Sequence, residues 1–274
     1  MATFLLIAAM SLLFAALAFL PEEWGSRAAH PLWRRARRPL FLALAHLSVA
    51  VFFWRMTFKF FPEIEARWMP VAGYALVERD VWLPAILLFP ASLAHLLPSR
   101  LRPAATLPLL IFLGLVLHAA SWRLDVPTRP LPSRFSEGVC LQTTGYTCAA
   151  ASAATLLHAM GIESSEDEMA RLASAHPKMG TSCYLAALAL QRKLDEAGGS
   201  GRAVVVAPGT DGLDALPAPF LAAMQYSPFL NHMVCVLRVS GARILVGDPI
   251  GGLSEWPRKE FERRWRGVAV VVER

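Results

Sequence analysis

Apolar residues divide this chain into two halves with different patterns. The first half carries four long apolar runs, at residues 1–20, 39–61, 81–97 and 104–122. Each run is close to the about 17–25 residues with which an α-helix crosses a bilayer. The pattern therefore predicts an all-α transmembrane region of about four helices over residues 1–124. Three prolines within residues 125–135 predict a stiff, extended linker after it.

The second half combines helix signals with strand signals, in that order. The alanine-rich run Ala149–Gly161 predicts a first helix, and the capping box Ser165-Glu166-Asp167-Glu168 opens a second. A third begins at Thr181 or Ser182. Strands and one short helix follow, at Arg202–Ala207, Pro219–Tyr226, His232–Val239, Ala242–Gly247, Pro257–Trp265 (the helix) and Gly267–Glu273. Helices followed by a mostly antiparallel sheet predict one α+β domain over residues 136–274.

Charge follows the same division. The chain has 274 residues, 55% of them hydrophobic, and a formal net charge of +6. Residues 1–134 hold 14 Lys and Arg against 7 Asp and Glu, whereas residues 135–274 hold 13 against 14. The basic excess therefore lies beside the apolar runs, where it sets membrane topology. No nucleic-acid motif accompanies it, so nucleic acid is not an expected partner.

An arginine cluster between the first two apolar runs indicates the membrane topology. The positive-inside rule places this loop in the cytoplasm, and four spans then put the α+β domain outside. Counted over all loops, basic residues divide evenly between the two sides, so the prediction rests on the first loop. The first run lacks the basic start and cleavage site of a signal peptide, and we interpret it as a retained anchor. The cluster consists of Arg27, Arg34, Arg35, Arg37 and Arg38.

The segment Gln142–Cys148 leads directly into the alanine-rich helix. Thr147 is an acceptable N-cap, so Cys148 falls in the first turn, where the helix dipole favours a thiolate. The side-chain amide of Gln142 can fold back and form an oxyanion hole with the backbone N–H of Cys148. A cysteine at a helix start is, taken alone, more often a small buried residue. Cys183, at the start of a later helix, is the second candidate for the nucleophile.

His232 and Asp248 favour a catalytic role for Cys148, because they can supply a base and a carboxylate. They stand on two strands joined by a tight turn, which is either a two-residue loop, Ser240-Gly241, or a three-residue loop that includes Val239. Only the three-residue loop sets His232 opposite Asp248 on one face of the sheet. We therefore predict that loop, with Gly241 at positive φ. The imidazole Nδ1–H would then donate to Asp248 and leave Nε2 for the cysteine.

Several of these motifs occur together, in an order that resembles a known family. Gln142–Cys148, Gly180-Thr181-Ser182, Asn231-His232 and Gly247-Asp248-Pro249 are similar to the cysteine peptidase domain of bacteriocin exporters. The resemblance implies a papain-like fold that cleaves double-glycine leader peptides. It assigns Cys148 as nucleophile, His232 as base, Asp248 as orienting carboxylate and Gln142 as oxyanion donor. The chain departs from the family pattern at Thr147, where an acidic residue is common, and it shows no ATPase domain.

The sequence thus predicts a membrane-anchored, papain-like cysteine peptidase of the Cys-His-Asp type in a bacterial inner membrane. Its expected partners are a peptide or leader-peptide substrate, the lipid bilayer and a membrane export partner. Two alternatives stay open: a catalytically silent peptide-binding domain, and a docking module of a membrane export or assembly complex. No cysteine or histidine spacing supports a metal site, and no phosphate-binding loop supports a nucleotide cofactor. A disulfide among Cys140, Cys183 and Cys235 is possible for an extracytoplasmic domain, without a defined pairing.

Overall fold

The computed structural model describes residues 39–51, 53, 61–69, 106–121, 132–177, 180–227 and 230–273, together with scattered residues between 89 and 104. The predicted apolar run 1–20 and most of 81–97 lie outside the described residues. The chain forms two compact units. One comprises Met1–Lys59 and Leu76–Ser121, and the other comprises Phe60–Ala75 and Trp122–Arg274.

The first unit contains helices at two of the predicted apolar runs. Residues 39–51 are helical, and α8 (Thr106–Ser121) spans 16 residues. Along α8 the side chains of Leu107, Leu110 and Leu117 are exposed. No helix among the described residues has the length and apolarity that crossing a membrane requires.

The second unit begins with a small hairpin and three helices. Strands β1 (Arg134–Ser136) and β2 (Val139–Leu141) pair antiparallel and precede α9 (Cys148–Ala159), α10 (Glu166–Leu172) and α11 (Cys183–Glu196). The three helices confirm those predicted from the alanine-rich run and the cap residues. The hairpin was not predicted, and β1 starts inside the stretch interpreted as linker.

The helix boundaries follow from their cap residues. Ser165 and Ser182 each accept a hydrogen bond from a backbone N–H in the first turn of the helix that follows, at 3.1 and 3.2 Å. Gly161 has φ of +78°, which confirms the left-handed C-cap expected after α9. The Glu168 side chain does not complete the predicted capping box, because it pairs with Lys193 at 2.6 Å instead.

A six-stranded antiparallel sheet forms the rest of the second unit. Its strand order is β3-β8-β4-β5-β6-β7, so β8 lies between β3 and β4, the two strands of this sheet that come first in the sequence. β7 was not predicted, and the short 3-10 helix η3 precedes β4. The bounds are β3 (Arg202–Val206), η3 (Thr210–Ala215), β4 (Phe220–Ser227), β5 (Leu230–Ser240), β6 (Arg243–Asp248), β7 (Gly252–Pro257), α12 (Arg258–Arg264) and β8 (Trp265–Glu273).

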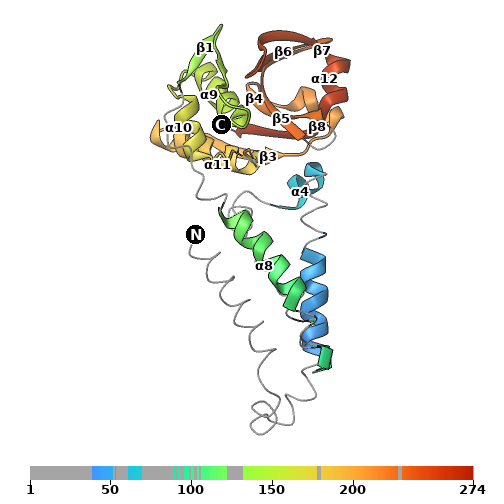
Figure 1. Cartoon of the computed structure of the whole chain (residues 1–274). Coiled ribbons are helices and arrows are strands. Elements are labelled where there is room, and N and C mark those ends of the chain that lie inside the picture. Colours follow the sequence, from blue (N-terminus) through green and yellow to red (C-terminus); the bar gives the residue numbers. More distant parts are fainter. Residues whose placement is uncertain are drawn as a thin grey trace. The chain divides into compact units, whose positions relative to one another are not determined.

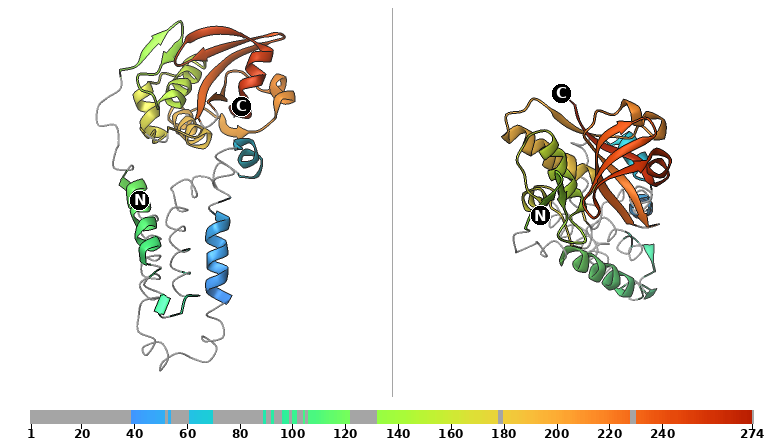
Figure 2. Two further views of the ribbon diagram at one scale, coloured as in Figure 1. Left: turned by 45° about the vertical axis from the view of Figure 1, so that its right-hand side comes forward. Right: turned by 90° about the horizontal axis from the view of Figure 1, so that it is seen from above.

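Each face of the sheet is covered by its own apolar core. Helices α9, α10 and α11 lie on one side of the unit and strands β4 to β8 on the other (Figure 1), and Figure 2 shows this arrangement from two more directions. The helices cover one face through their alanines and leucines. The other face packs against Leu213 of η3 and Phe261 of α12. Through these two cores the N-terminus of α9 has a fixed position relative to the strands of the sheet.

The hairpin between β5 and β6 differs from the prediction. Ser240 pairs with Arg243, so the loop has two residues, Gly241 and Ala242, and the predicted three-residue loop is wrong. The register shifts between Val236 and Arg238, where β5 holds one residue more than β6. This β-bulge reverses which face the preceding residues point to, so His232 still shares a face with Asp248. The two-residue loop and the bulge together give His232 and Asp248 the shared face that the predicted three-residue loop would have given them.

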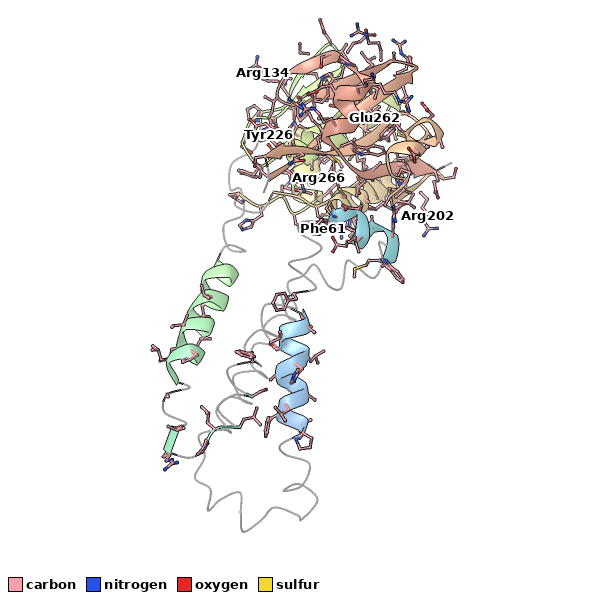
Figure 3. All side chains as sticks on the ribbon, turned by 90° about the vertical axis from the view of Figure 1, so that its right-hand side faces the viewer. Phe61, Arg134, Arg202, Tyr226, Glu262 and Arg266 are labelled. Carbon is pink, nitrogen blue, oxygen red and sulfur yellow. The ribbon has the colours of Figure 1, made fainter. Side chains whose placement is uncertain are left out.

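One short helix from the N-terminal half packs on the α+β domain. Helix α4 (Pro62–Trp68) contacts β3 and β8, and the hydroxyl of Tyr184 in α11 donates to the carbonyl of Met69 at 3.2 Å. Phe61 and Arg202, labelled in Figure 3, mark where α4 begins and where β3 begins. The folded unit is therefore larger than the domain expected at residues 136–274.

The φ of +51° at Gly241 confirms the predicted positive value, and it provides a test of the turn. No atom outside its immediate chain neighbours lies within 4 Å of a Cβ added there. Gly241→Ala should therefore lower the free energy of unfolding by about 1–2 kcal/mol through backbone strain alone. Urea unfolding measures this change. Gly241→Asn is the control, because Asn tolerates the left-handed region and should recover most of the loss; equal stability of all three proteins would contradict the observed turn.

Candidate active site

Cys148 is the first residue of α9, as the sequence predicted. Thr147 precedes it at the N-cap position, but its side chain makes no capping hydrogen bond. Since the N–H groups of a first helical turn have no intrahelical partner, they and the helix dipole favour negative charge at the Cys148 sulfur. Cys148 is partly exposed, so a substrate can reach it.

Ser152 fixes α9 against the strand that carries His232. One turn after Cys148, the Ser152 hydroxyl donates to the carbonyl of Met233 at 2.9 Å in a buried position. Met233 directly follows His232, so this single bond sets the Cys148 end of the helix beside the imidazole. In the sequence Ser152 is only a polar residue within an alanine-rich run, and no local pattern predicts this role.

Gly247 lets the helix and the next strand approach closely. A Cβ at this position would lie 3.1 Å from the side chains of both Thr155 on α9 and Val139 on β2. Thr155 in turn accepts a hydrogen bond from the Cys140 N–H at 2.9 Å. Because any larger residue would push the strand away from α9, the glycine keeps the neighbouring Asp248 within reach of the site.

His232 joins the cysteine to the carboxylate. Its ring is 9% exposed, and Nε2 lies 2.8 Å from Oδ1 of Asp248. Burial opposes protonation, but the hydrogen bonds to Asp248 and Cys148 outweigh it and raise the pKa of His232 from 6.5 to about 9. The imidazole is therefore held as imidazolium at neutral pH, with its positive charge beside the Cys148 sulfur.

The ring nitrogens are used in the reverse of the predicted order. Nε2 faces Asp248, which leaves Nδ1 for Cys148. The strand register explains the exchange. Continued by one residue from the pair Cys235–Gly247, it sets Asp248 beside Val234, two residues from His232. Diagonal neighbours are farther apart than opposed ones, and the outer nitrogen of the ring spans that distance.

Asp248 is itself held in place by the turn that follows it. Its Oδ1 accepts a hydrogen bond from the Ile250 N–H at 2.9 Å. Burial alone would raise the pKa of this carboxyl, but the hydrogen bonds from His232 and the Ile250 and Gly251 backbones lower it below the ordinary value. Asp248 therefore stays ionised and can orient a protonated imidazole.

Gln142 lies at the same end of the domain, joined to the Asp248 turn. Its backbone N–H donates to the Pro249 carbonyl at 2.8 Å, and its Nε2 donates to the Thr144 carbonyl at 2.8 Å. A side-chain amide has two N–H donors, so one stays available for an oxyanion. Its position in sequence and its attachment to the site are thus compatible with the predicted role.

The domain matches known proteins over its whole length. A model of the peptidase C39 family matches residues 136–274. This chain belongs to the peptidase C39 family. The resemblance drawn from the motifs is therefore confirmed at the level of the family, and the α+β peptidase-like fold is confirmed with it. The arrangement on a membrane anchor is not part of this match.

Similar proteins extend the comparison. An uncharacterized protein of Methanothermobacter marburgensis is 32% identical over 138 residues, which are 50% of this chain and 89% of that protein. The probable functional amyloid protease FapD of Pseudomonas aeruginosa is 28% identical over 134 residues, 48% of this chain and 58% of FapD. The match therefore covers less than two thirds of FapD.

Two solved structures are also similar. A double glycine motif protease from an AMS/PCAT transporter, in complex with the leader peptide, is 18% identical, with a TM-score of 0.43 over 54% of this chain and 95% of that chain. The peptidase domain of Streptococcus ComA, a bifunctional ABC transporter of a quorum sensing pathway, is 19% identical, with a TM-score of 0.41 over 48% and 95%.

The other cysteines of the C39 domain are placed differently from Cys148. Cys140 and Cys235 are buried, whereas Cys148 and Cys183 are partly exposed. Burial raises the pKa of the Cys140 thiol to about 12, with a further contribution from the charge of Glu166, and raises the pKa of Cys235 as well. Cys183 starts α11, whereas the side-chain hydrogen bonds of His232 go to Asp248 and Cys148.

Two other histidines of the matched domain contact residues outside the set Cys148, His232 and Asp248. His158 is exposed with its ring 5.1 Å from that of Phe135, and His176 forms a backbone bridge with Gly180. Neither contributes to the C39 site in the structure. Among the described residues, no group of three or more His, Cys, Asp and Glu side chains could hold a metal ion.

Exposed apolar side chains border the set Cys148, His232 and Asp248, and no sequence pattern predicted them. The Tyr226 ring is 64% exposed and lies 5.8 Å from the His232 ring, and Ile250, beside Asp248, is 55% exposed. Figure 3 labels Tyr226 at the surface of the domain. Large apolar residues left in solvent next to a reactive group provide a surface for a bound chain.

Reactivity toward a thiol reagent tests the assignment of Cys148. Near pH 6, iodoacetamide should modify Cys148 before the other three cysteines, because only Cys148 combines a helix N-terminus with an imidazolium partner. Mass spectrometry of the alkylated protein locates the adduct. His232→Ala should slow the reaction at Cys148, while preferential modification of Cys183 would show that the assignment is wrong.

Proposed function

We propose that this chain is a cysteine peptidase that hydrolyses a peptide bond through a thioester at Cys148. The observation that carries the proposal is the connected set Cys148, His232 and Asp248 at the N-terminus of α9, within a domain of a peptidase family. A buried imidazolium held by a carboxylate has no structural need in an apolar core, and such perturbed groups gather at functional sites.

In the first half of the reaction, the Cys148 thiolate attacks the carbonyl carbon of the substrate. The carbonyl oxygen becomes an oxyanion, which the Cys148 backbone N–H and the free N–H of the Gln142 amide stabilise. His232 then gives its proton to the leaving nitrogen, the C–N bond breaks, and the amine product departs. The acyl group stays on the sulfur as a thioester.

In the second half, neutral His232 takes a proton from a water molecule as that water attacks the thioester. The C–S bond breaks, the carboxylic product leaves, and the thiolate–imidazolium pair is restored. Asp248 keeps the ring in one orientation throughout and stabilises its positive charge. Both steps use only residues of this chain and one water molecule.

The substrate class follows from the family and from the site. We propose a peptide or leader peptide that lies across the exposed side chains of Tyr226 and Ile250, with the scissile carbonyl between Cys148 and Gln142. The motif resemblance favours a double-glycine cleavage site. An export partner in the membrane would supply such substrates.

We further propose that the apolar first half anchors the peptidase in a bacterial inner membrane, with the peptidase domain on the extracytoplasmic side. The position of helix α4 limits the number of membrane spans that this topology can have after Met69. Because α4 packs against β3 and β8, it lies on the same side of the membrane as the domain. The number of spans between Met69 and Arg134 is then even, and the sequence supplies two apolar runs there, 81–97 and 104–122.

Hydrolysis of a fluorogenic peptide amide ending in Gly-Gly tests the proposed activity. The purified full chain should release the fluorophore, Cys148→Ala should not, and Cys183→Ala is the matched control that keeps activity. The rate should fall on the alkaline side as His232 loses its proton with a pKa of about 9. Asp248→Asn removes a contribution that raises this pKa, so its alkaline limb should move to lower pH by about 1–2 units.

Two results of this assay would reject the proposal. Turnover that survives Cys148→Ala would assign the chemistry elsewhere. A wild-type protein that binds peptides with the same affinity as Cys148→Ala, and cleaves none of a peptide library, would instead identify a silent peptide-binding domain.

Cysteine labelling in spheroplasts tests the topology. Trp68 on α4 is 81% exposed and the Arg238 side chain on β5 is 63% exposed, so Trp68→Cys and Arg238→Cys each present an accessible thiol. A membrane-impermeant maleimide should label both, and mapping of the adducts distinguishes them from native cysteines. Protection of both would place the domain in the cytoplasm, and labelling of one alone would contradict the shared side.

A further inference from the structure

Glu166 is a charged residue without any exposed surface. It is the first residue of α10, and its side chain is 0% exposed. A carboxylate removed from water is costly unless hydrogen bonds replace its hydration. In the sequence Glu166 is an ordinary helix-start residue, since Asp and Glu are common in first turns. Its burial requires a reason that local helix stability does not give.

The hydrogen bonds of Glu166 go to the loop that precedes Cys148. Oε1 accepts from the Thr143 N–H at 2.8 Å and from the Thr147 hydroxyl. The backbone N–H of Glu166 donates to the Ser133 hydroxyl at 2.8 Å, which fixes the start of α10 to the chain leading into β1. One carboxylate oxygen therefore holds both ends of the loop Thr143–Thr147.

This loop connects the two groups that would act on the substrate. The hydroxyls of Thr144 and Thr147 lie 2.8 Å apart, and the Thr144 carbonyl accepts the hydrogen bond from the Gln142 amide at 2.8 Å. A continuous series of hydrogen bonds thus runs from Glu166 through Thr147 and Thr144 to Gln142. The orientation of the oxyanion donor depends on the carboxylate at the far end.

The same contact changes the N-terminus of α9. A threonine at an N-cap position ordinarily accepts a hydrogen bond from an N–H of the first turn. The Thr147 hydroxyl instead donates to Glu166, and the helix has no side-chain cap. The N–H groups beside Cys148 are left without a competing oxygen, so they stay available to a thiolate or an oxyanion.

The second oxygen of the carboxylate shows that this arrangement is not optimised for stability. Oε2 is buried and has no hydrogen-bond partner among the described residues. Leaving a buried acceptor unpaired costs free energy. Local rules are broken in this way mainly at functional sites, where geometry outweighs stability.

We propose that Glu166 is a positioning residue of the peptidase: its carboxylate holds the loop Thr143–Thr147 so that Gln142 and Cys148 converge on one carbonyl, and it keeps the Thr147 hydroxyl from capping α9. The proposal rests on the proposed function, in which both residues act on a peptide carbonyl. It adds a residue on a separate helix, outside the Cys-His-Asp set, on which the geometry of the oxyanion site depends.

Substitutions at both ends of the Glu166–Thr147 bond test the proposal. Glu166→Ala and Thr147→Val should each lower kcat by about tenfold to a hundredfold with little change in KM, because the oxyanion donor is misplaced while the binding surface is intact. Glu166→Gln and Thr147→Ser keep the acceptor oxygen and the hydroxyl, so both should stay within about threefold of wild type. The double variant Glu166→Ala/Thr147→Val should lose no more than either single variant, since both break one network.

Two further measurements separate positioning from stability and from the function itself. Glu168→Gln, which removes the same charge from the same helix but faces Lys193, is the matched control and should leave kcat unchanged. Iodoacetamide alkylation of Cys148 near pH 6 should slow about two- to fivefold in Glu166→Ala, because the freed Thr147 hydroxyl can cap α9 and compete with the thiolate for its N–H groups, and it should not slow in Thr147→Val, which has no hydroxyl to form that cap. This readout needs no peptide substrate, so it decides the proposal even if the wild-type protein cleaves none.

The outcomes that overturn the proposal are specific. Wild-type kcat and alkylation rate in folded Glu166→Ala would do so, as would a Glu166→Gln variant impaired as strongly as Glu166→Ala. Urea unfolding of each variant establishes the folded fraction. If Glu166→Ala does not fold, the pair Thr147→Val and Thr147→Ser decides, and equal activity of these two rejects the role.

Discussion

The alternation of side chains along a β-strand is the constraint on which this site depends. Every second residue points to the same face, so His232 and Asp248 can meet only if the number of residues between them places both side chains on one face. A two-residue turn alone would send the two side chains to opposite faces. Leu237 is the extra residue of β5 that returns both side chains to one face, and it lies before the pair Arg238–Leu245, outside the turn itself. The 2.8 Å contact between imidazole and carboxylate is the result.

Helix α9 covers the opposite face of the sheet, and its composition lets its N-terminus come close to the strand that carries His232. Its alanines between Ala149 and Ala154 are buried and bring the backbone close to β5, where the Ser152 hydroxyl bonds the carbonyl next to His232. Gly247 removes the one side chain that would keep β6 away. Small residues on both partners thus fix a distance that larger ones would have made variable, and reactive groups need such fixed distances.

The sequence predicted those parts of the molecule whose signals are local. The start of α9, the turn at Gly161 and the strands at His232 and Asp248 each depend on neighbours within a few residues, and all were found. The bulge was missed because Leu237 is an ordinary strand residue, and nothing in its type marks an insertion. The ring nitrogen facing Asp248 depends on that register and was reversed with it. Glu166 resembled a common helix-start residue, and only the tertiary structure shows its burial.

The order of the strands has a consequence for how the molecule is made. β8 follows every other strand of the sheet in the sequence, yet it lies between β3 and β4 and forms part of the surface that α4 contacts. The sheet is therefore incomplete until β8 has been synthesised, although α4 is made about 200 residues earlier and waits for that surface. A chain truncated before β8 would lack the strand that joins β3 to β4 and with it most of the contacts of α4.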